Sequence, residues 1–556
     1  MEKIKIRVRT APRADFTETF ADEGTTLASL ADRYQAALPY RILAAKAGCQ
    51  IRELNKTIDA PCDITLLDMR TGTVNLMYQR SLSLLYLKAV SDVLGKADVF
   101  LGNSLNKGIY TEIRGETRVG AGDVKRIEDR MRDLVRADLP IVKQWADRET
   151  AIRFLREDGH REKLRLLESA PDIDRIAFYS LDGFRDYFYG QMLPSTGYAE
   201  HFELREYEKG VLLRFPHPSK PDEIPPYADE HKLYEAFGEA SHWGRLLGIS
   251  VARDLNEQVE NGRCVEMIQL SEALHEKSIA YIADRIVREK KRIVLIAGPS
   301  SSGKTTFARR LCIQLKVNGR NPLYLGTDDY YLERADTPLD EYGERNFENI
   351  EALDLGLFNS HMNALLRGDA ADIPRYDFRA GQKVFGERVT TAGPDQPIVI
   401  EGIHGLNRIL TEGIDDAQKF RIYISPLTAL NIDDHNRIPV TDIRLLRRMV
   451  RDHQFRGSHA KETIATWPKV RAGEDKNIFP FSGEADVLFN SGHIYEISVL
   501  KKYAMPLLDE IGPEEEAYNE AYRLRRFLDF FKEIEDDSAI MNNSILREFI
   551  GGSIFV

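Results

Sequence analysis

The segment Gly298–Thr305 reads GPSSSGKT and has the spacing GxxxxGK[ST] of a loop that binds the phosphates of a nucleoside triphosphate. Glycines let backbone N–H groups curl around phosphate oxygens, and Lys304 brings a positive charge to the β- and γ-phosphates. The hydroxyl of Thr305 suits a magnesium ion. The residues expected to contact the nucleotide are Gly298, Ser300, Ser301, Ser302, Gly303, Lys304, Thr305 and Thr306.

The residues on either side of this loop predict the strand and the helix that position it. Ile293 to Ala297 form a continuous apolar run, which is typical of a buried parallel strand. After the loop, Phe307, Leu311 and Leu315 recur at helical spacing. We therefore expect an α/β domain in which the phosphates lie at the N-terminus of a helix.

Two carboxylates follow further predicted strands. Asp328 comes directly after residues 321–327, and Glu401 closes the apolar run that begins at Pro397. The C-terminal ends of strands in an open α/β sheet line the crevice where ligands bind. Asp328 is therefore expected to accept a proton from an acceptor hydroxyl or to help hold magnesium, and Glu401 to hold a metal ion or a water molecule.

Two more segments offer groups for a charged transition state and for an acceptor molecule. Residues 443–456 read IRLLRRMVRDHQFR and contain Arg444, Arg447, Arg448, Arg451 and Arg456. Mobile arginines of this kind can neutralise the negative charge that spreads during phosphoryl transfer. Residues 374–378 (PRYDF) combine rings and a carboxylate in a predicted loop, which suits stacking and hydrogen bonding on an acceptor.

In this order, the motifs resemble the uridine kinase and phosphoribulokinase family over residues 290–495. GPSSSGKT is followed by DDYY, NFEN, PRYDF, IVIEG and the arginine-rich segment, as in that family. The resemblance implies a P-loop kinase domain with a mostly parallel sheet, using ATP and Mg²⁺.

The resemblance also implies roles for individual residues. Asp328 would be the catalytic base, and Lys304, Arg448 and Arg451 would act on the transferred phosphoryl group. Thr305 and Glu401 would hold the metal, and Arg456 would lie beside the nucleotide. The residues implied to contact the acceptor are Asp328, Tyr331, Glu348, Tyr376 and Phe378.

Three departures from the family pattern leave the acceptor open. Gly381 stands where uridine–cytidine kinases carry a base-recognising histidine, Glu348 replaces an aspartate, and Ser458 replaces the last arginine of an RGR motif. A pocket that loses a hydrogen-bond donor can change its specificity. The first candidate acceptor is the 5′-hydroxyl of uridine or cytidine, and the alternative is a sugar phosphate or another hydroxyl compound. The chain also inserts residues 429–443 ahead of the arginines.

The first 70 residues predict a small β-grasp unit. Ile4, Ile6 and Val8 alternate with charged residues as in a half-buried strand, a helix is expected around Leu27 to Tyr34, and residues 64–67 predict a later strand. This segment is similar to the TGS domain of threonyl-tRNA synthetases and some regulatory GTPases, whose TGS modules are mostly binding units.

Residues 71–265 look like the second additional, editing domain of threonyl-tRNA synthetase. An amphipathic helix is predicted over residues 123–139, and the proline-rich residues 215–230 predict a loop. In the synthetase this domain has HxxxH and CxxxH metal-site motifs. The corresponding positions here are Arg80, Leu84, Phe188 and Met192. These residues do not suit a hydrolytic metal centre, so editing activity is not expected.

The rest of the chain is predicted to contain a P-loop nucleoside kinase domain (266–510) and a C-terminal helical extension (511–556). A helix over residues 267–291 would lead into the first strand of the kinase, and residues 514–536 have the broad apolar face of a helix that packs on the body. With the two N-terminal units this makes an α/β multidomain protein, which suits a length of 556 residues.

Composition narrows the remaining classes of function. The chain is 43% hydrophobic and 30% charged, with no apolar stretch long enough to cross a bilayer and no secretory signal at its start, so cytoplasmic residence is expected. A net charge of −11 argues against a broad nucleic-acid surface, although a local basic site stays open. The alternative from another class is an RNA-associated regulatory protein that nucleotide binding switches. The N-terminal units suggest homo-oligomerisation or gating of the active site as hypotheses.

Overall fold

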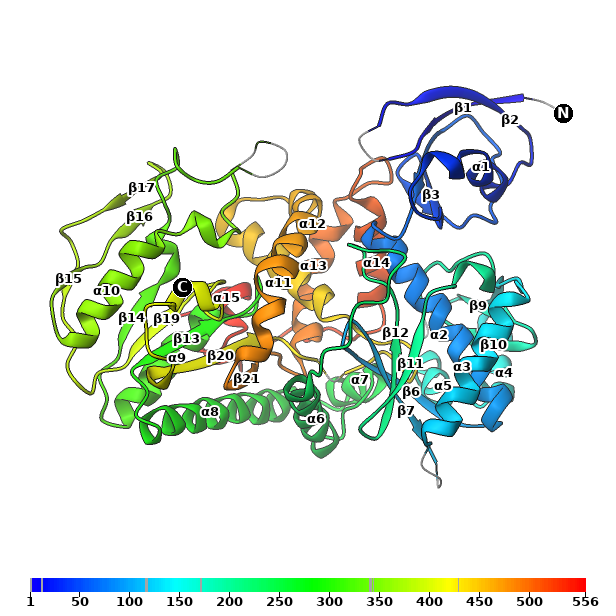
Figure 1. Cartoon of the computed structure of the whole chain (residues 1–556). Helices are drawn as coiled ribbons and strands as arrows, with labels where there is room; N and C mark the ends of the chain where they lie inside the picture. The colour runs from blue at the N-terminus through cyan, green and yellow to red at the C-terminus, as the bar shows by residue number, and fades with distance from the viewer. Residues whose placement is uncertain are drawn as a thin grey trace.

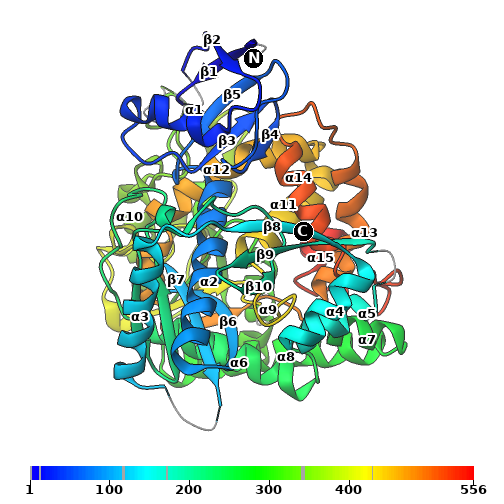
Figure 2. The ribbon, with the colours of Figure 1, turned by 90° about the vertical axis from the view of Figure 1, so that its right-hand side faces the viewer.

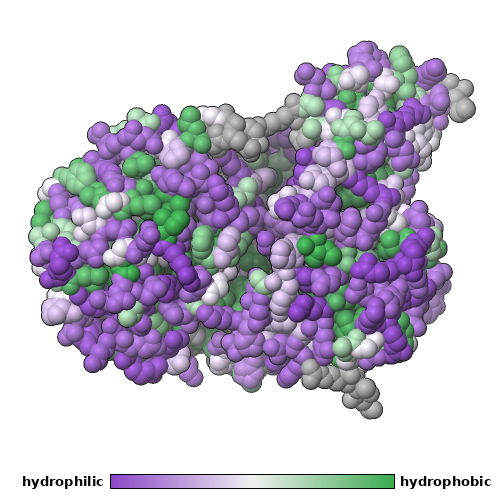
Figure 3. Space-filling view, viewed as in Figure 1, coloured by the Kyte–Doolittle hydropathy of each residue, from purple (hydrophilic) through white to green (hydrophobic). Residues whose placement is uncertain are grey.

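The computed structural model describes the chain except for residues 1–2, 12–13, 116–118, 171–172, 340–342, 344 and 429. Figure 1 shows the N-terminal sheet at the upper right end of the molecule, and the sheet that carries the phosphate loop at the left. The space-filling view has a largely hydrophilic face with a recess between these two parts (Figure 3). No helix in the described part of the chain is both long and apolar enough to cross a membrane.

The N-terminal segment forms a five-stranded mixed sheet with one helix packed against it (Figure 2). Its elements are β1 (Lys3–Arg9), β2 (Thr17–Asp22), α1 (Leu27–Tyr34), β3 (Ala44–Ala47), β4 (Gln50–Arg52) and β5 (Asp63–Leu67). The strand order is β2-β1-β5-β3-β4. The alternating pattern of β1 buries Ile4, Ile6 and Val8 against Leu27 and Leu30 of the helix, as predicted. The assignment to a TGS-like β-grasp stays a prediction.

The next segment has two antiparallel sheets around a long buried helix. Its elements are α2 (Gly72–Leu94), β6 (Asp98–Leu105), β7 (Gly108–Arg114), α3 (Ala121–Arg136), β8 (Val142–Asp147), α4 (Arg148–Asp158), α5 (Arg161–Glu168), β9 (Arg175–Leu181), β10 (Phe184–Tyr187), β11 (Glu203–Tyr207) and β12 (Gly210–Arg214). The sheet orders are β11-β12-β7-β6 and β10-β9-β8. The amphipathic helix predicted over 123–139 is α3, and residues 215–230 form no helix or named strand, as expected.

Three helices connect this segment to the phosphate loop. They are α6 (His231–Leu246), α7 (Ala252–Glu260) and α8 (Cys264–Arg288). The helix predicted over 267–291 is α8, which begins and ends three residues earlier. Ile279, Ile282 and Ile286 of α8 are buried in the main hydrophobic core, so its apolar face positions the first strand that follows.

A five-stranded parallel sheet carries the phosphate loop at its centre. Its elements are β13 (Ile293–Ala297), α9 (Lys304–Val317), β14 (Leu323–Gly326), β19 (Ile398–Glu401), β20 (Lys419–Ser425) and β21 (Val487–Asn490). The order is β14-β19-β13-β20-β21, and every pairing is parallel. All five residues of β13 are buried, which agrees with the continuous apolar run in the sequence. The C-terminal region is therefore the predicted α/β unit with a parallel sheet.

The connections between these strands contain smaller elements. They are α10 (Leu355–Arg367), β15 (Ala371–Asp372), β16 (Arg375–Asp377), β17 (Gln382–Val384), β18 (Val389–Thr390), α11 (Val440–Arg456) and α12 (Ala460–Asn477). The predicted loop at PRYDF is wrong in part, because β16 pairs with β17 as a short hairpin. The carboxylate of Asp377 stabilises the turn by accepting hydrogen bonds from the N–H groups of Arg379 and Ala380.

The C-terminal segment adds α13 (Glu496–Asp509), α14 (Tyr518–Leu528) and α15 (Arg547–Ile550). The helix expected over 514–536 is shorter than predicted, since only α14 is helical there. Its apolar face, with Leu524 and Phe527 fully buried, packs on the body as expected. The chain then continues to α15, which lies beside α11 (Figure 1).

The insertion before α11 contacts the segment that resembles the synthetase domain. Its residue 429 lies outside the described residues. Asn431 donates a side-chain hydrogen bond to the carbonyl of Leu101 at 2.8 Å, and Asn436 donates one to the carbonyl of Tyr187 at 3.1 Å. Phe178 of β9 and Ile432 of the insertion belong to one hydrophobic core that also contains residues of α9. The insertion therefore joins the two parts of the chain.

Candidate active site

The phosphate loop has the backbone geometry that its glycines predict. Gly303 caps α9 with φ +84°, and a Cβ on Gly298 would lie 2.1 Å from the carbonyl oxygen of Ile424. Ser301 adopts φ +61°. The hydroxyls of Ser301 and Ser302 are buried without a hydrogen-bond partner in the described part of the chain. Orphaned hydroxyls at a helix N-terminus suit a loop that binds an anionic ligand.

Lys304 folds back onto the loop. Its ammonium donates hydrogen bonds to the carbonyls of Gly298 at 3.0 Å and Pro299 at 3.2 Å. Burial lowers the pKa of Lys304, while the charge of Glu401 acts in the opposite direction. The lysine is thus held at the loop and must exchange these carbonyls for phosphate oxygens when a nucleotide binds.

Thr305 and Glu401 meet between β13 and β19. The hydroxyl of Thr305 donates to Glu401 Oε1 at 3.0 Å, and the hydroxyl of Tyr324 donates to the same oxygen at 3.1 Å. Burial raises the pKa of Glu401, and the positive charge of Lys304 opposes this shift. A hydroxyl and a carboxylate are oxygen donors, the type that Mg²⁺ prefers, so these residues fit a magnesium ion.

Asp328 lies in a short 3₁₀ segment, η3 (Thr327–Tyr330), directly after β14. Desolvation by the surrounding protein and then the charge of Glu401 raise its pKa to about 6, although Lys304 acts to lower it. The side chain of Asp328 is exposed, so an acceptor molecule can reach it. The structure therefore brings Asp328, Lys304 and Glu401 within electrostatic range of one another.

An aromatic cluster adjoins this acidic centre. The ring centroids of Tyr331 and Tyr376 lie 5.7 Å apart, and those of Tyr376 and Phe378 lie 5.0 Å apart. Tyr331 and Tyr376 are buried, whereas Phe378 is 58% exposed. The hydroxyl of Tyr376 is buried without a partner in the described part of the chain. The rings leave an unused polar group that an acceptor molecule can bind.

Glu348 lies near the same centre. Burial raises its pKa, and Glu474 adds repulsion, while Lys304 and Arg448 attract the charged form. Its backbone N–H donates to the side chain of Asn346 at 3.0 Å, which orders the NFEN segment. The structure thus brings Glu348 into electrostatic range of the loop.

Two of the five arginines of α11 are structural, which corrects their interpretation as mobile groups. Arg444 and Arg447 are fully buried. Arg444 donates to the carbonyl of Ser300 at 2.9 Å and forms an ion pair with Glu474. Arg447 donates to Glu496 at 2.5 Å. A buried guanidinium paired with a carboxylate cannot swing onto a phosphate without leaving that carboxylate uncompensated.

The other three arginines are more accessible. Arg448 donates to the hydroxyl of Ser300 at 2.9 Å, so it already touches the phosphate loop. Arg451 donates to Asp452 at 2.8 Å, and Arg456 lies 3.4 Å from the same carboxylate with 57% of its side chain exposed. All three arginines assigned to the lid pair with Asp452, and within the described residues Arg448 is the one that also hydrogen bonds to the loop.

Sequence reasoning missed two acids that contact the loop. Glu474 of α12 accepts a hydrogen bond from the backbone N–H of Ser300 at 2.9 Å. Glu548 of α15 accepts one from the backbone N–H of Thr306 at 3.2 Å. Both acids are buried, and both come from segments far along the chain. No motif marks them, since only tertiary packing brings them to the loop.

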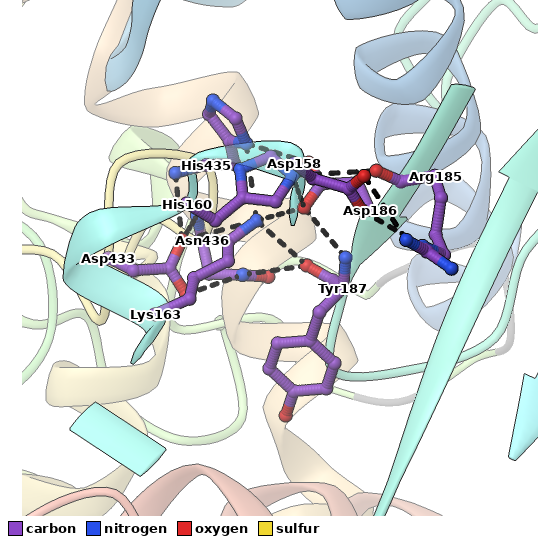
Figure 4. A network of polar contacts seen from close by, with 9 residues as sticks. All are labelled: Asp158, His160, Lys163, Arg185, Asp186, Tyr187, Asp433, His435 and Asn436. Atoms are coloured by element: carbon purple, nitrogen blue, oxygen red, sulfur yellow. Dashed lines mark hydrogen bonds and ion pairs between the residues drawn. The ribbon is translucent and has the colours of Figure 1, made fainter. Parts of the chain in front are cut away.

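A second polar cluster lies away from the loop, between the synthetase-like segment and the insertion (Figure 4). His160, Asp186 and His435 have ligand atoms within 4.8 Å of one another, as in a metal site. Lys163 already stands among them. Its ammonium forms an ion pair with Asp186 and lies 3.2 Å from Nδ1 of His435. A lysine supplies the positive charge that a metal ion would bring, so we assign this cluster to interface packing.

Part of the chain is similar to proteins of one kinase family. The phosphoribulokinase / uridine kinase family matches residues 293–498. A uridine kinase of Deinococcus deserti is 29% identical over 205 residues, which cover 37% of this chain and 89% of that protein. A possible uridine kinase from Bacillus stearothermophilus is a similar solved structure, with 20% identity, a TM-score of 0.26, and 38% of this chain and 96% of that chain covered.

The chain also matches threonine–tRNA ligases. The ligase of Symbiobacterium thermophilum is 28% identical over 182 residues, which cover 33% of this chain and 28% of the ligase. The chain thus spans only about a third of the length of such ligases. One region of this chain is therefore similar to threonine–tRNA ligases. The C-terminal region of the chain carries a phosphoribulokinase/uridine kinase family domain, the domain of a P-loop phosphotransferase.

Proposed function

We propose that this protein transfers the γ-phosphoryl group of ATP to a hydroxyl of a small molecule, with the 5′-hydroxyl of uridine or cytidine as the first candidate. The observation that carries the proposal is the convergence of Asp328, Lys304 and Glu401 at the ends of three adjacent parallel strands. Ligands of open α/β sheets bind at that edge.

Asp328 is proposed as the general base. A pKa of about 6 leaves the carboxylate ionised at neutral pH and gives it more proton affinity than an ordinary aspartate has. It would take the proton of the acceptor hydroxyl as that oxygen attacks phosphorus. Lys304 and Arg448 would stabilise the negative charge on the transferred group.

Thr305 and Glu401 would hold magnesium through their hydroxyl and carboxylate oxygens. When bound, the ion supplies charge neutralisation to the phosphates. The hydroxyl of Tyr324 orients Glu401 by donating to the oxygen that also accepts from Thr305. Tyr324 is therefore proposed to fix the carboxylate for this task.

The acceptor is proposed to lie against the aromatic cluster of Tyr331, Tyr376 and Phe378. A buried pair of rings beside a partly exposed one suits a flat apolar group with polar edges. Glu348 would accept hydrogen bonds from hydroxyls of the acceptor, as the resemblance implies. These features support a nucleoside.

One observation favours the alternative, a sugar phosphate or another anionic hydroxyl compound. A Cβ on Gly381 would lie 2.7 Å from Nε of Arg334, so this side chain fills the space beside Gly381. The backbone N–H of Arg334 donates to the carbonyl of Gly381 at 2.7 Å, which fixes the arrangement. An arginine offers only hydrogen-bond donors and a positive charge, which suits an anionic acceptor.

The test is ATP- and Mg²⁺-dependent ADP release by the full chain with uridine, cytidine and a panel of sugar phosphates. Turnover of a nucleoside supports the first candidate, and turnover of sugar phosphates alone supports the second. Asp328→Asn should lower acceptor-dependent release by about 10²–10⁴-fold, whereas Asp336→Asn, which changes an exposed acid of the same connection, should not. Salt-sensitive RNA binding without any acceptor-dependent ADP release would instead favour an RNA-associated nucleotide switch.

A further inference from the structure

A cavity of about 40 Å³ lies between the synthetase-like segment and the insertion that precedes α11. This volume exceeds the space that one water molecule needs, about 10–15 Å³ by the same kind of measure. The polar side chains that line it are Gln79, Arg80, Ser83, Tyr189, His435, Asn436 and Arg437. It lies at the positions where the resemblance places the lost metal ligands, since Arg80 and Phe188 both line it.

Arg80 is an unpartnered cation in this cavity. Within the described part of the chain, its guanidinium donates no hydrogen bond and forms no ion pair, and its Cζ lies 5.5 Å from the ring centroid of Tyr189. Gly190 packs so closely that a Cβ there would lie 2.6 Å from Cζ of Arg80. A guanidinium has five N–H donors, and those of the half-buried Arg80 have no acceptor from the protein within the described residues. They are therefore open to an acceptor that enters the cavity.

A second guanidinium faces the same cavity. Arg437 donates a hydrogen bond to Oε1 of Gln79 at 2.7 Å, but an amide oxygen leaves its charge uncompensated. Burial lowers the pKa of Arg437, and repulsion from Arg80 lowers it further. Two half-buried positive charges that repel each other favour a negative charge near both of them.

The carboxylates around the cavity already have cationic partners. Asp442, whose charge acts on both arginines, accepts two hydrogen bonds from Arg523 at 2.6 and 2.8 Å. The same Arg523 also pairs with Glu520, so one guanidinium serves two acids. Asp186 of the neighbouring cluster is paired with Lys163 and His435 (Figure 4). Within the described residues, none of these acids hydrogen-bonds to Arg80 or Arg437.

We propose that this cavity binds a small oxyanion, of the size of phosphate, between the guanidinium groups of Arg80 and Arg437. Arginine forks match the oxygens of phosphate and carboxylate groups, which is why two of them around a cavity select such a ligand. Ser83 and Asn436 line the same cavity and add neutral hydrogen-bonding groups.

The site is connected to the phosphate loop through α11. Pro439 lines the cavity and directly precedes α11, and Arg448 of that helix donates to Ser300. Nine residues of helix span roughly 14 Å. An anion that fixes Arg437 therefore fixes the start of the helix that contacts the loop, and it is expected to change the affinity for nucleotide.

The location can be tested by crystallising the full chain with selenate, an oxyanion of similar shape that gives an anomalous signal. The proposal expects a peak between Arg80 and Arg437. A cavity without a peak, in crystals where selenate occupies the phosphate loop, would overturn it.

The affinity can be tested in solution by calorimetric titration with inorganic phosphate, in a Lys304→Ala background that weakens binding at the loop. Arg80→Met should reduce the remaining binding at least tenfold, and Arg80→Lys should restore part of it. Arg126→Met is the matched control, because it removes an exposed arginine of the same segment that pairs with Asp123. Equal binding by Arg80→Met and Arg126→Met would refute the proposal.

Should Arg80→Met fail to fold, Arg437→Gln serves the same comparison. Malonate titrated in parallel separates carboxylate from phosphoryl sources.

Discussion

Glu548 accepts hydrogen bonds from both the backbone N–H and the hydroxyl of Thr306, at 3.2 and 2.8 Å. Thr306 follows the GKT of the phosphate loop, in the first turn of α9, where backbone donors and the helix dipole favour a negative charge. The same C-terminal segment brings Ile545 against Gly303 and places the ring of Phe549 4.9 Å from Cζ of Arg447. A carboxylate therefore stands at donors that the sequence assigns to a nucleotide.

We expect Glu548→Gln to bind ATP more tightly than the unaltered protein. Glutamine keeps an oxygen acceptor near Thr306 but removes the negative charge that competes with phosphate oxygens. The expected gain is roughly threefold to tenfold in the dissociation constant, or about 1 kcal/mol. Calorimetric titration with a non-hydrolysable ATP analogue measures it.

The matched control is Glu535→Gln, which removes an exposed carboxylate of the same C-terminal segment. Its affinity for the analogue should equal that of the unaltered protein. If Glu548→Gln binds ATP no more tightly than this control, Glu548 does not compete with the nucleotide and instead belongs to the wall of the site.

Asp328→Asn should lower turnover by about 10²–10⁴-fold, the range that a positioned general base contributes. Affinity for ATP should change little, because the phosphates are held by the loop and Lys304. Single-turnover ADP formation and nucleotide titration, made on the same preparation, separate the two effects. Turnover equal to that of the unaltered protein would remove Asp328 from the role of base.

The pH dependence of kcat/KM should show an acid limb near pH 6. Asp328 acts as a base only when ionised, and its raised pKa of about 6 means that protonation inactivates it as the pH falls through that value. Above the limb, activity should be level until other groups titrate. A profile that stays flat down to pH 4.5 would contradict this assignment.

The sequence predicts the phosphate loop and its flanking elements well because local rules determine them. The GxxxxGK[ST] spacing, the apolar run of β13 and the helical spacing of α9 all lie within 25 consecutive residues. Asp328 and Glu401 could be placed for a similar reason, since each ends a strand of a parallel sheet. Pattern and topology together fix which edge of the sheet they occupy.

Tertiary packing decided what the sequence could not predict. Arg444 and Arg447 look like further solvent-accessible members of an arginine run, yet they lie on the inner face of α11 and are paired with Glu474 and Glu496. Glu548 lies 242 residues from Thr306, and nothing near it in sequence marks a nucleotide site. The role of the insertion could not be predicted either, because its partners are in the synthetase-like segment.

Tyr376→Phe should weaken acceptor binding without weakening the fold. The hydroxyl of Tyr376 is buried and has no partner in the described part of the chain, so its removal relieves an unsatisfied group and should leave stability unchanged or slightly raised. If an acceptor uses this hydroxyl, KM for the acceptor should rise about tenfold while KM for ATP stays the same. Steady-state kinetics with both substrates varied provide the measurement. An unchanged acceptor KM would place the acceptor away from Tyr376.

Gly303→Ala should destabilise the protein more than Gly319→Ala does, although both glycines lie at ends of α9 with positive φ, +84° and +73°. A Cβ on Gly319 meets nothing within 4 Å, so alanine there costs only the left-handed backbone, about 1 kcal/mol. A Cβ on Gly303 would lie 2.4 Å from Cγ2 of Ile545, so the C-terminal segment must shift. Such a shift costs about 1–3 kcal/mol more.

Urea denaturation of the two glycine variants measures the difference in their stability. Adding Ile545→Ala removes the clashing methyl group, so the extra cost of Gly303→Ala should shrink in that background even though Ile545→Ala is itself destabilising. If the two glycine variants lose the same stability, the C-terminal segment does not pack on the loop in solution. Glu548 would then not compete with the nucleotide for the donors of Thr306.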